Sequence, residues 1–370
     1  MIDRDEFSAW LRLLETPGVG REAARALLAR FGSPDAAIGA STTARAAVVP
    51  AAVAGALATA PDHFEGRLAA AWQWLQDGDE PRDAIALGDP RYPPALLDSP
   101  DPPLLLYARG RSELLQAPAI AIVGSRNPTP QGLENARAFA AHLGGAGWVV
   151  VSGLALGIDG AAHEGALAGG GTTVAVVGTG LDIDYPTPHR TLARTIARAG
   201  LLLSEFAIGT PALAANFPIR NRIIAGLTRG TLVVEAAVQS GSLITARLAA
   251  EAGREVFAIP GSIHSPQARG CHALIKQGAK LVDSAADIVE ELAPLRRHPS
   301  AVARPQPSSA PVTPKDPVLD ALGFDPIGLD ALVARTGRSA SELSARLLDL
   351  ELQGHVARLP GQQFQRVERA

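Results

Sequence analysis

Several short segments rich in glycine and serine directly follow apolar runs, and their residue types suit the binding of an anion. Gly124, Ser125 and Arg126 follow the buried-strand pattern Ala-Ile-Ala-Ile-Val at 119–123. Glycine lets the backbone turn sharply, and doubly wound α/β sheets bind ligands beyond the carboxyl ends of their strands. The N-terminus of a following helix would add oriented N–H groups. The pattern predicts a phosphate-binding site, for a nucleotide or for a nucleic acid. Similar turns contain Ser152 and Gly153, Gly178 and Gly180, and Ser240, Gly241 and Ser242.

A second segment, 217–222, reads Phe-Pro-Ile-Arg-Asn-Arg. Proline is favourable in a first helical turn, so Phe217 is expected to precede a helix. The start of that helix would present Arg220, Asn221 and Arg222. Guanidinium and amide groups suit phosphate oxygens, and an exposed phenylalanine can stack on a base. The alternative is that Phe217 belongs to the core and the arginines pair with Glu205 or Glu235.

No catalytic constellation is predicted. Asp159 and His163 are four residues apart on an expected helix, but such a pair is more often structural. His272 lies next to Cys271 without a third group to activate the thiol. No Cys/His spacing is typical of a zinc site, so no metal is expected. The Gly-x-Gly-x-x-Gly spacing and the Walker A lysine are missing, so no dinucleotide or other cofactor is expected.

The composition of the chain limits the classes of protein to which it can belong. Of 370 residues, 47% are hydrophobic and 4% aromatic, and the formal net charge is −3. The length predicts two to three domains, and nucleic-acid binding would need a local cluster of basic residues. The single cysteine excludes an internal disulfide framework. The acidic start lacks a signal-peptide pattern and no apolar run reaches about 18 residues, so we expect a cytoplasmic protein without membrane contact.

Residues 1–83 are expected to form a helical domain. Apolar positions at 11–14 and on one face of 21–31 flank the turn Thr-Pro-Gly-Val-Gly at 16–20, which is typical of a helix-hairpin-helix. The N–H groups of Gly18 and Gly20 could meet a DNA phosphate. Because the hairpin carries few basic residues, contact with protein is the favoured role.

Residues 84–294 are expected to form the central domain. Its first part, 84–117, is rich in proline and is predicted to be an irregular, extended lead-in. Strands are then predicted at 119–123, 148–152, 172–177, 201–203, 231–235, 255–259 and 280–282. Helices are predicted at 130–143, 158–168, 188–199, 218–227, 242–252 and 271–277. This alternation predicts an α/β fold with a doubly wound, mainly parallel sheet covered on both faces.

Residues 295–316 are rich in Pro, Ser and Ala and are predicted to be a flexible linker. Beyond it, 317–370 are predicted to form a winged helix, with helices at 327–335 and 341–353 and a strand pair around Val356, Phe364 and Val367. The segment 315–370 has seven Lys/Arg and eight Asp/Glu. Contact with protein or a structural role is therefore favoured over DNA binding.

The order and spacing of these segments closely resemble the DprA (Smf) family of bacterial DNA-processing proteins. The resemblance covers the whole central domain and extends to the lead-in around Tyr92 and Pro103 and to the layout of the flanking domains. The segments that carry it are 121–126, 152–163, 178–181 with Tyr185 and Pro186, 204–205, 217–226 and 240–246.

The resemblance implies an extended Rossmann-like fold with an N-terminal helix-hairpin-helix or SAM-like domain and a C-terminal winged helix. It implies a non-catalytic protein that binds single-stranded DNA, protects incoming DNA and loads the RecA recombinase in natural transformation. Members dimerise through the Rossmann-like core. The implied DNA site comprises Gly124, Ser125, Arg126, Gly153, Phe217, Arg220, Asn221, Arg222, Ser240, Gly241 and Ser242.

Two positions depart from the family pattern. Leu156 stands where many members have lysine or arginine, so one backbone charge is missing. His272 replaces an asparagine common in the corresponding segment. Each departure is expected to weaken a contact while the central pocket remains.

Two rival functions make different demands on the sequence. Nucleotide-cleaving enzymes on a related fold, such as cytokinin-activating phosphoribohydrolases, carry Pro-Gly-Gly-x-Gly-Thr-x-x-Glu after a strand. Here 239–247 reads Gln-Ser-Gly-Ser-Leu-Ile-Thr-Ala-Arg and offers no carboxylate, which favours binding over cleavage. A transcription factor that reads double-stranded DNA with the winged helix is disfavoured by the charge of that segment.

Overall fold

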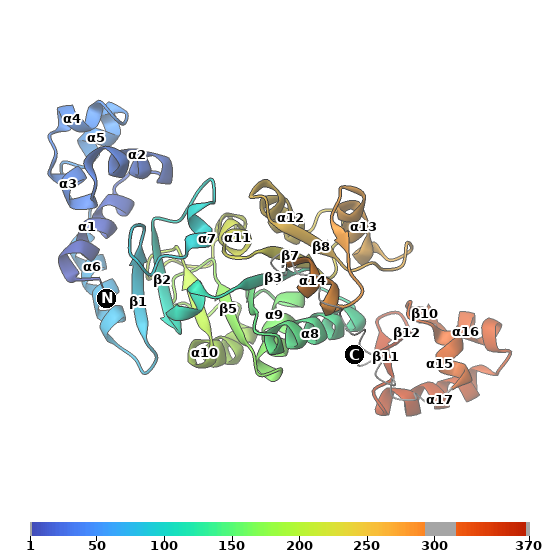
Figure 1. Cartoon of the computed structure of the whole chain (residues 1–370). Helices are drawn as coiled ribbons and strands as arrows, with labels where there is room; N and C mark the ends of the chain where they lie inside the picture. Colours follow the sequence, from blue (N-terminus) through green and yellow to red (C-terminus); the bar gives the residue numbers. More distant parts are fainter. Residues whose placement is uncertain (1, 293–315, 368–370) are drawn as a thin grey trace, which may run out of the picture.

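A computed structural model describes residues 2–292 and 316–367 of the chain. Its centre is a sheet with the strand order β1-β2-β6-β5-β4-β3-β7-β8-β9 (Figure 1). The strands β3 to β9 run parallel, whereas β1 and β2 join one edge in antiparallel pairing. The predicted doubly wound, mainly parallel sheet is therefore confirmed. The strands are β1 (Arg82–Ala86), β2 (Leu105–Gly110), β3 (Ala119–Val123), β4 (Val149–Ser152), β5 (Thr172–Val176), β6 (Leu201–Ser204), β7 (Gly230–Val233), β8 (Glu255–Ala258) and β9 (Lys280–Leu281).

Strand β3 is buried along its whole length, and its side chains alternate between two apolar cores. Ala121 and Val123 belong to the core shared with α7 (Pro94–Leu97), α11 (Asn216–Leu227), α12 (Gly241–Glu251) and α13 (Arg269–Lys276). Ile120 and Ile122 belong to the opposite core, shared with α8 (Pro130–Gly145), α9 (Ile158–Ala168) and α14 (Ala285–Leu292). The continuous apolar run therefore reflects a strand covered on both faces.

The N-terminal helices pack against the antiparallel edge of the sheet (Figure 1). Tyr107 of β2 meets the ring of Phe7 at a centroid distance of 6.2 Å and that of Trp74 at 6.3 Å. These helices share an apolar core with β1, β2 and α10 (Arg190–Ala199). The helices are α1 (Arg4–Glu15), α2 (Arg21–Phe31), α3 (Pro34–Gly39), α4 (Thr42–Ala46), α5 (Ala51–Ala56) and α6 (Phe64–Gln76), so the two helices predicted to flank the turn at 16–20 are present.

The prediction that 84–117 is irregular was wrong. Strands β1 and β2 pair with each other, and β2 also pairs with β6, with Tyr107 opposite Ser204. Pro102 and Pro103 precede β2 and leave its ladder intact. The four-residue helix α7 begins with Pro94, a position where the missing N–H has no helical partner to lose.

The C-terminal residues form a separate small core. Its elements are α15 (Pro317–Leu322), β10 (Ile327–Gly328), α16 (Leu329–Thr336), α17 (Ala340–Leu352), β11 (Val356–Leu359) and β12 (Gln363–Arg366), with the strand order β10-β12-β11. The predicted linker lies outside the described residues except for Asp316, which caps α15 through a 2.8 Å bond from the Val318 N–H. None of the helices described in 2–292 and 316–367 is long and apolar enough to cross a membrane.

Candidate nucleic-acid interface

A cavity of about 500 Å³ opens at the carboxyl ends of β3 and β7. This is the point where the strand order changes direction, because β4 to β6 extend to one side of β3 and β7 to β9 to the other. Ligands of open α/β sheets bind at such a switch point. The walls come from the turn after β3, the first turns of α11 and the turn that leads into α12.

The turn after β3 is held in place by tight backbone contacts. A Cβ on Gly124 would lie 2.7 Å from Cγ1 of Ile158, so a side chain would not fit there. The Ser125 N–H donates to the Glu235 carbonyl at 2.7 Å, and the Asn127 N–H donates to Oγ of Ser125 at 3.1 Å. This turn projects the next residue, Arg126, over the cavity.

Arg126 is exposed, and no ion pair joins it to an acid anywhere in the described part of the chain. Its guanidinium carbon lies 5.8 Å from the centroid of the Phe217 ring. A cation beside an aromatic ring can meet a phosphate while the ring meets a base. The predicted neighbours Arg126 and Phe217 are thus brought together.

Phe217 lies inside the first turn of α11, which begins at Asn216, so the prediction that it precedes the helix was wrong by two residues. The ring is half-buried, and the Tyr185 ring is 5.4 Å away at an interplanar angle of 35°. Both rings line a small cavity of about 80 Å³ together with Leu156 and Gly153. The separation of Tyr185 and Phe217 in the sequence gives no sign of this contact.

Arg220 forms a fixed cation at the floor of both cavities. Its side chain is only 4% exposed, and Nη1 donates to the Val176 carbonyl at 2.5 Å. Burial lowers the pKa of Arg220 to about 10, although the nearby charge of Asp159 opposes the shift. Gly153 makes room for this arrangement, because a Cβ there would lie 1.8 Å from Nη1 of Arg220.

Asp159 is buried behind the same wall. One carboxylate oxygen accepts the N–H groups of Gly153 at 3.1 Å and Ala155 at 3.3 Å. Burial raises the pKa of Asp159, while the charge of Arg220 acts in the opposite direction. The aspartate therefore organises the β4–α9 turn and balances the buried arginine.

The turn before α12 completes the cavity. Ser240 is the N-cap of α12, and its Oγ lies 2.7 Å from Oγ of Ser242. Asn221 reaches across from α11, with Nδ2 3.5 Å from the Gly241 carbonyl. The cavity thus contains the predicted residues Gly124, Ser125, Arg126, Phe217, Arg220, Asn221, Ser240, Gly241 and Ser242, with Gly153 in the adjoining small cavity.

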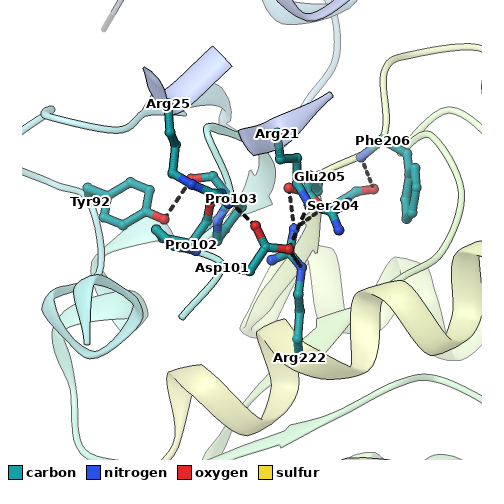
Figure 2. Close-up of polar contacts among 10 residues, drawn as sticks. All are labelled: Arg21, Arg25, Tyr92, Asp101, Pro102, Pro103, Ser204, Glu205, Phe206 and Arg222. Atoms are coloured by element: carbon teal, nitrogen blue, oxygen red, sulfur yellow. Dashed lines mark hydrogen bonds and ion pairs between the residues drawn. The ribbon is translucent and has the colours of Figure 1, made fainter. Parts of the chain in front are cut away.

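Arg222 is placed elsewhere. Its Nη2 lies 2.5 Å from both carboxylate oxygens of Glu205, and its Nε lies 3.1 Å from Oδ2 of Asp101 (Figure 2). The side chain is 10% exposed and does not line either cavity. Of the arginine–glutamate pairs weighed from the sequence, only Arg222 with Glu205 forms; Glu235 instead accepts the N–H and hydroxyl of Thr129.

The other groups considered for chemistry are buried or held by hydrogen bonds. Nδ1 of His163 lies 2.7 Å from Oγ1 of Thr173, and burial lowers the pKa of His163 to about 3. Burial also raises the pKa of the Cys271 thiol to about 12. His272 lies 2.9 Å from the Gly261 carbonyl through Nε2. Within the described residues, no three His, Cys, Asp or Glu side chains gather as a metal site.

The sheet order and the cavity at its switch point define a Rossmann-like α/β protein. The chain belongs to the DNA recombination-mediator protein A family, whose model matches residues 83–293. A model of the DprA winged helix domain matches 302–362.

Known proteins and structures are similar over much of the chain. Protein Smf of Escherichia coli is 44% identical over 275 residues, which cover 73% of this chain and 74% of that protein. DNA processing protein DprA of Streptococcus pneumoniae is 49% identical over 208 residues, or 56% of this chain and 73% of that protein. A crystal structure of S. pneumoniae DprA has a TM-score of 0.68 and 37% identity and covers 78% of this chain and 98% of that one. A structure of DNA processing protein A from Helicobacter pylori, described in terms of its single-stranded DNA binding mode, has a TM-score of 0.52 and 31% identity, over 57% of this chain and 95% of that one.

Proposed function

We propose that this chain binds single-stranded DNA in the large cavity and acts as a recombination mediator, protecting incoming DNA and loading RecA in natural transformation. The observation that carries the proposal is the pairing of the free Arg126 cation with the half-buried Phe217 ring. Family membership and the single-stranded DNA binding of the H. pylori protein support it. The proposed contacts are Gly124, Ser125, Arg126, Gly153, Phe217, Arg220, Asn221, Ser240, Gly241 and Ser242; Arg222 is left out because its ion pairs hold it away.

The shape of the site favours a single strand. Phe217 is recessed in the cavity, beside Tyr185, so a base must leave a stack to reach it. A single strand presents its bases freely, whereas a duplex would have to unpair one first. Phosphates held by Arg126 and by the N-terminus of α12 would bind either form.

Binding rather than cleavage fits the polar groups of the cavity. Asp159 is the one carboxylate among the described residues that line it, and it accepts hydrogen bonds from the backbone N–H groups of Gly153 and Ala155. A general base must reach the proton that it abstracts, and this carboxylate is 7% exposed. We therefore propose a non-catalytic role without a cofactor.

Gel shifts with single- and double-stranded oligonucleotides of one sequence test the proposal. We expect tighter binding of the single strand, with a dissociation constant that rises with salt because phosphates are bound. Equal affinity for the two forms would contradict it. Incubation with nucleoside monophosphates tests the rival, since base release at ordinary enzyme rates would identify a cleaving enzyme.

We further propose that residues 118–290 form a homodimer in the cytoplasm. The chain carries a net charge of −3, so one cavity with few cations should hold a strand weakly. Two cavities in a dimer would raise the effective concentration for a strand that spans both. Val238, 63% exposed and next to the cavity residue Gln239, and Ile263, 75% exposed, supply apolar surface of the central domain for such an interface.

A further inference from the structure

Asp101 joins two parts of the molecule that are far apart in the sequence. The loop between α7 and β2 carries this residue, and three arginines converge on its carboxylate (Figure 2). From α2, Nε of Arg21 lies 2.8 Å from Oδ2 and Nη1 of Arg25 lies 2.5 Å from Oδ1. From α11, Nε of Arg222 lies 3.1 Å from Oδ2. One carboxylate thus connects the helix-hairpin-helix to α11.

The loop holds Asp101 in a defined position. Prolines at 100, 102 and 103 restrict the backbone on both sides. The Tyr92 hydroxyl donates to the Pro103 carbonyl at 2.7 Å. Burial alone would raise the pKa of Asp101, but the arginines outweigh it and hold the pKa below its usual value. The carboxylate is therefore a charged, fixed anchor.

Helix α11 carries both the anchor contact and the wall of the DNA cavity. Its first turns present Phe217, Arg220 and Asn221 to the cavity, and Arg222 follows directly and turns toward Asp101 and Glu205. Neighbouring residues differ by about 100° around a helix, which explains why Arg222 faces away from its neighbours. Any shift of α11 at Arg222 therefore also moves the residues of the cavity.

We propose that Asp101 is a positioning residue for the DNA cavity, through which the N-terminal helices set the position of α11. The inference rests on the proposed function and deepens it. Arg21 and Arg25 act through Asp101 and do not touch DNA, since their guanidinium groups are already held by the carboxylate. The N-terminal helices thereby tune the affinity of a site that they do not line.

Binding of a fluorescent oligo-dT by two sets of variants tests the inference. Asp101→Asn removes a negative charge, which by simple electrostatics should strengthen DNA binding. Loss of positioning predicts the opposite, a weakening of about threefold to tenfold. Arg21→Gln with Arg25→Gln should weaken binding similarly. Combining all three changes should weaken DNA binding little further, because all of them break the same connection between the N-terminal helices and α11.

Matched controls separate positioning from folding and from charge. Arg67→Gln removes an arginine from the same group of helices that pairs with Glu15 and not with Asp101, and it should leave affinity unchanged. Asp101→Glu keeps the charge and should restore part of the affinity. All variants should remain folded, as followed by thermal melting, because Phe7 and Trp74 hold the N-terminal helices on the sheet through Tyr107.

The salt dependence distinguishes positioning from direct contact. Positioning leaves the slope of log affinity against log salt unchanged in the Arg21/Arg25 variant. A slope smaller in magnitude by about 0.7 per lost contact would show that these arginines bind phosphate themselves and would overturn the inference. If the wild type binds the oligonucleotide and the variants bind it equally well, only the coupling through Asp101 is overturned. If the wild type does not bind it, the proposed function is overturned as well.

Discussion

Replacing Gly153 by alanine should disturb the cavity through a single added carbon. The new Cβ would lie 1.8 Å from Nη1 and 2.2 Å from Cζ of Arg220, far inside contact distance. The β4–α9 turn cannot retreat easily, because Asp159 holds the N–H groups of Gly153 and Ala155. We therefore expect the guanidinium to move.

The magnitude follows from what Arg220 loses. Its hydrogen bond to the Val176 carbonyl is charged, a type worth about 1.5–3 kcal/mol. The buried Asp159 would also lose part of the positive charge that now offsets its burial. Alanine also reduces the conformational freedom of the unfolded chain, which offsets this loss of stability by about 0.4–1 kcal/mol. We expect the free energy of unfolding to fall by about 2 kcal/mol and DNA affinity to fall by about tenfold.

Gly241→Ala provides a matched control for stability, because it adds the same carbon to the wall of the adjoining cavity. No atom lies within 4 Å of a Cβ built on Gly241, so this variant should be as stable as wild type. Denaturant unfolding compares the stability of the two variants, and oligo-dT binding compares Gly153→Ala with the wild type. If Gly153→Ala were as stable as Gly241→Ala and bound oligo-dT as tightly as the wild type, the packing of Arg220 under Gly153 could not be as described.

The pH dependence supplies a further check on the same variant. Burial raises the pKa of Asp159 in the folded state, so the folded state holds this proton more tightly and charging the group costs stability as pH rises above about 4. With Arg220 displaced, that cost should grow. The stability deficit of Gly153→Ala relative to wild type should therefore be larger at pH 7 than at pH 4. A deficit independent of pH would assign the whole effect to the steric clash.

Three other changes test the site and the assembly. Arg126→Ala should weaken single-strand binding and reduce the magnitude of the slope of log affinity against log salt by about 0.7. Arg111→Ala, at the opposite edge of the sheet and paired with Glu113, should change neither the affinity nor the slope. Equal effects of the two changes would show that the site lies elsewhere. Phe217→Ala should cost about 1–3 kcal/mol of binding with the slope preserved if the ring stacks on a base, and an altered slope would contradict stacking. Deleting 295–370 should leave a homodimer in light scattering that binds long oligonucleotides more tightly than short ones; a monomer at micromolar concentration with length-independent binding would refute the two-cavity arrangement.

The parallel part of the sheet was predictable because each strand carries its own signal. Runs such as 119–123 are apolar throughout, and a strand buried on both faces requires that pattern. Strands β1 and β2 are harder to predict, because the prolines around them indicate irregular backbone for the whole segment. In the structure those prolines end before β2 begins, the apolar residues from Leu105 to Tyr107 pair with β1, and Tyr107 also lies opposite Ser204 of β6.

The site was predictable to the extent that its residues adjoin strand ends. Gly124, Ser125 and Arg126 follow β3, and Ser240 caps α12, so topology alone brings them to one edge. The direction of a side chain on a helix is harder to predict. The sequence presents Arg220 and Arg222 as equivalent, yet they are two positions apart on α11 and so point in different directions.

The contact between Arg222 and Asp101 was the hardest part of this arrangement to predict from the sequence. Asp101 lies 121 positions before Arg222 and 76 after Arg25, in a loop whose composition indicates only irregular backbone. An acid that contacts three arginines can be recognised only once the fold brings them together. Two of these arginines belong to the N-terminal helices, and the third belongs to the helix that forms a wall of the cavity. The carboxylate that holds Arg222 away from the predicted DNA site therefore also links that site to a distant part of the chain. The absence of Arg222 from the cavity and the connection between the cavity and the N-terminal helices are thus two consequences of the same interaction with Asp101.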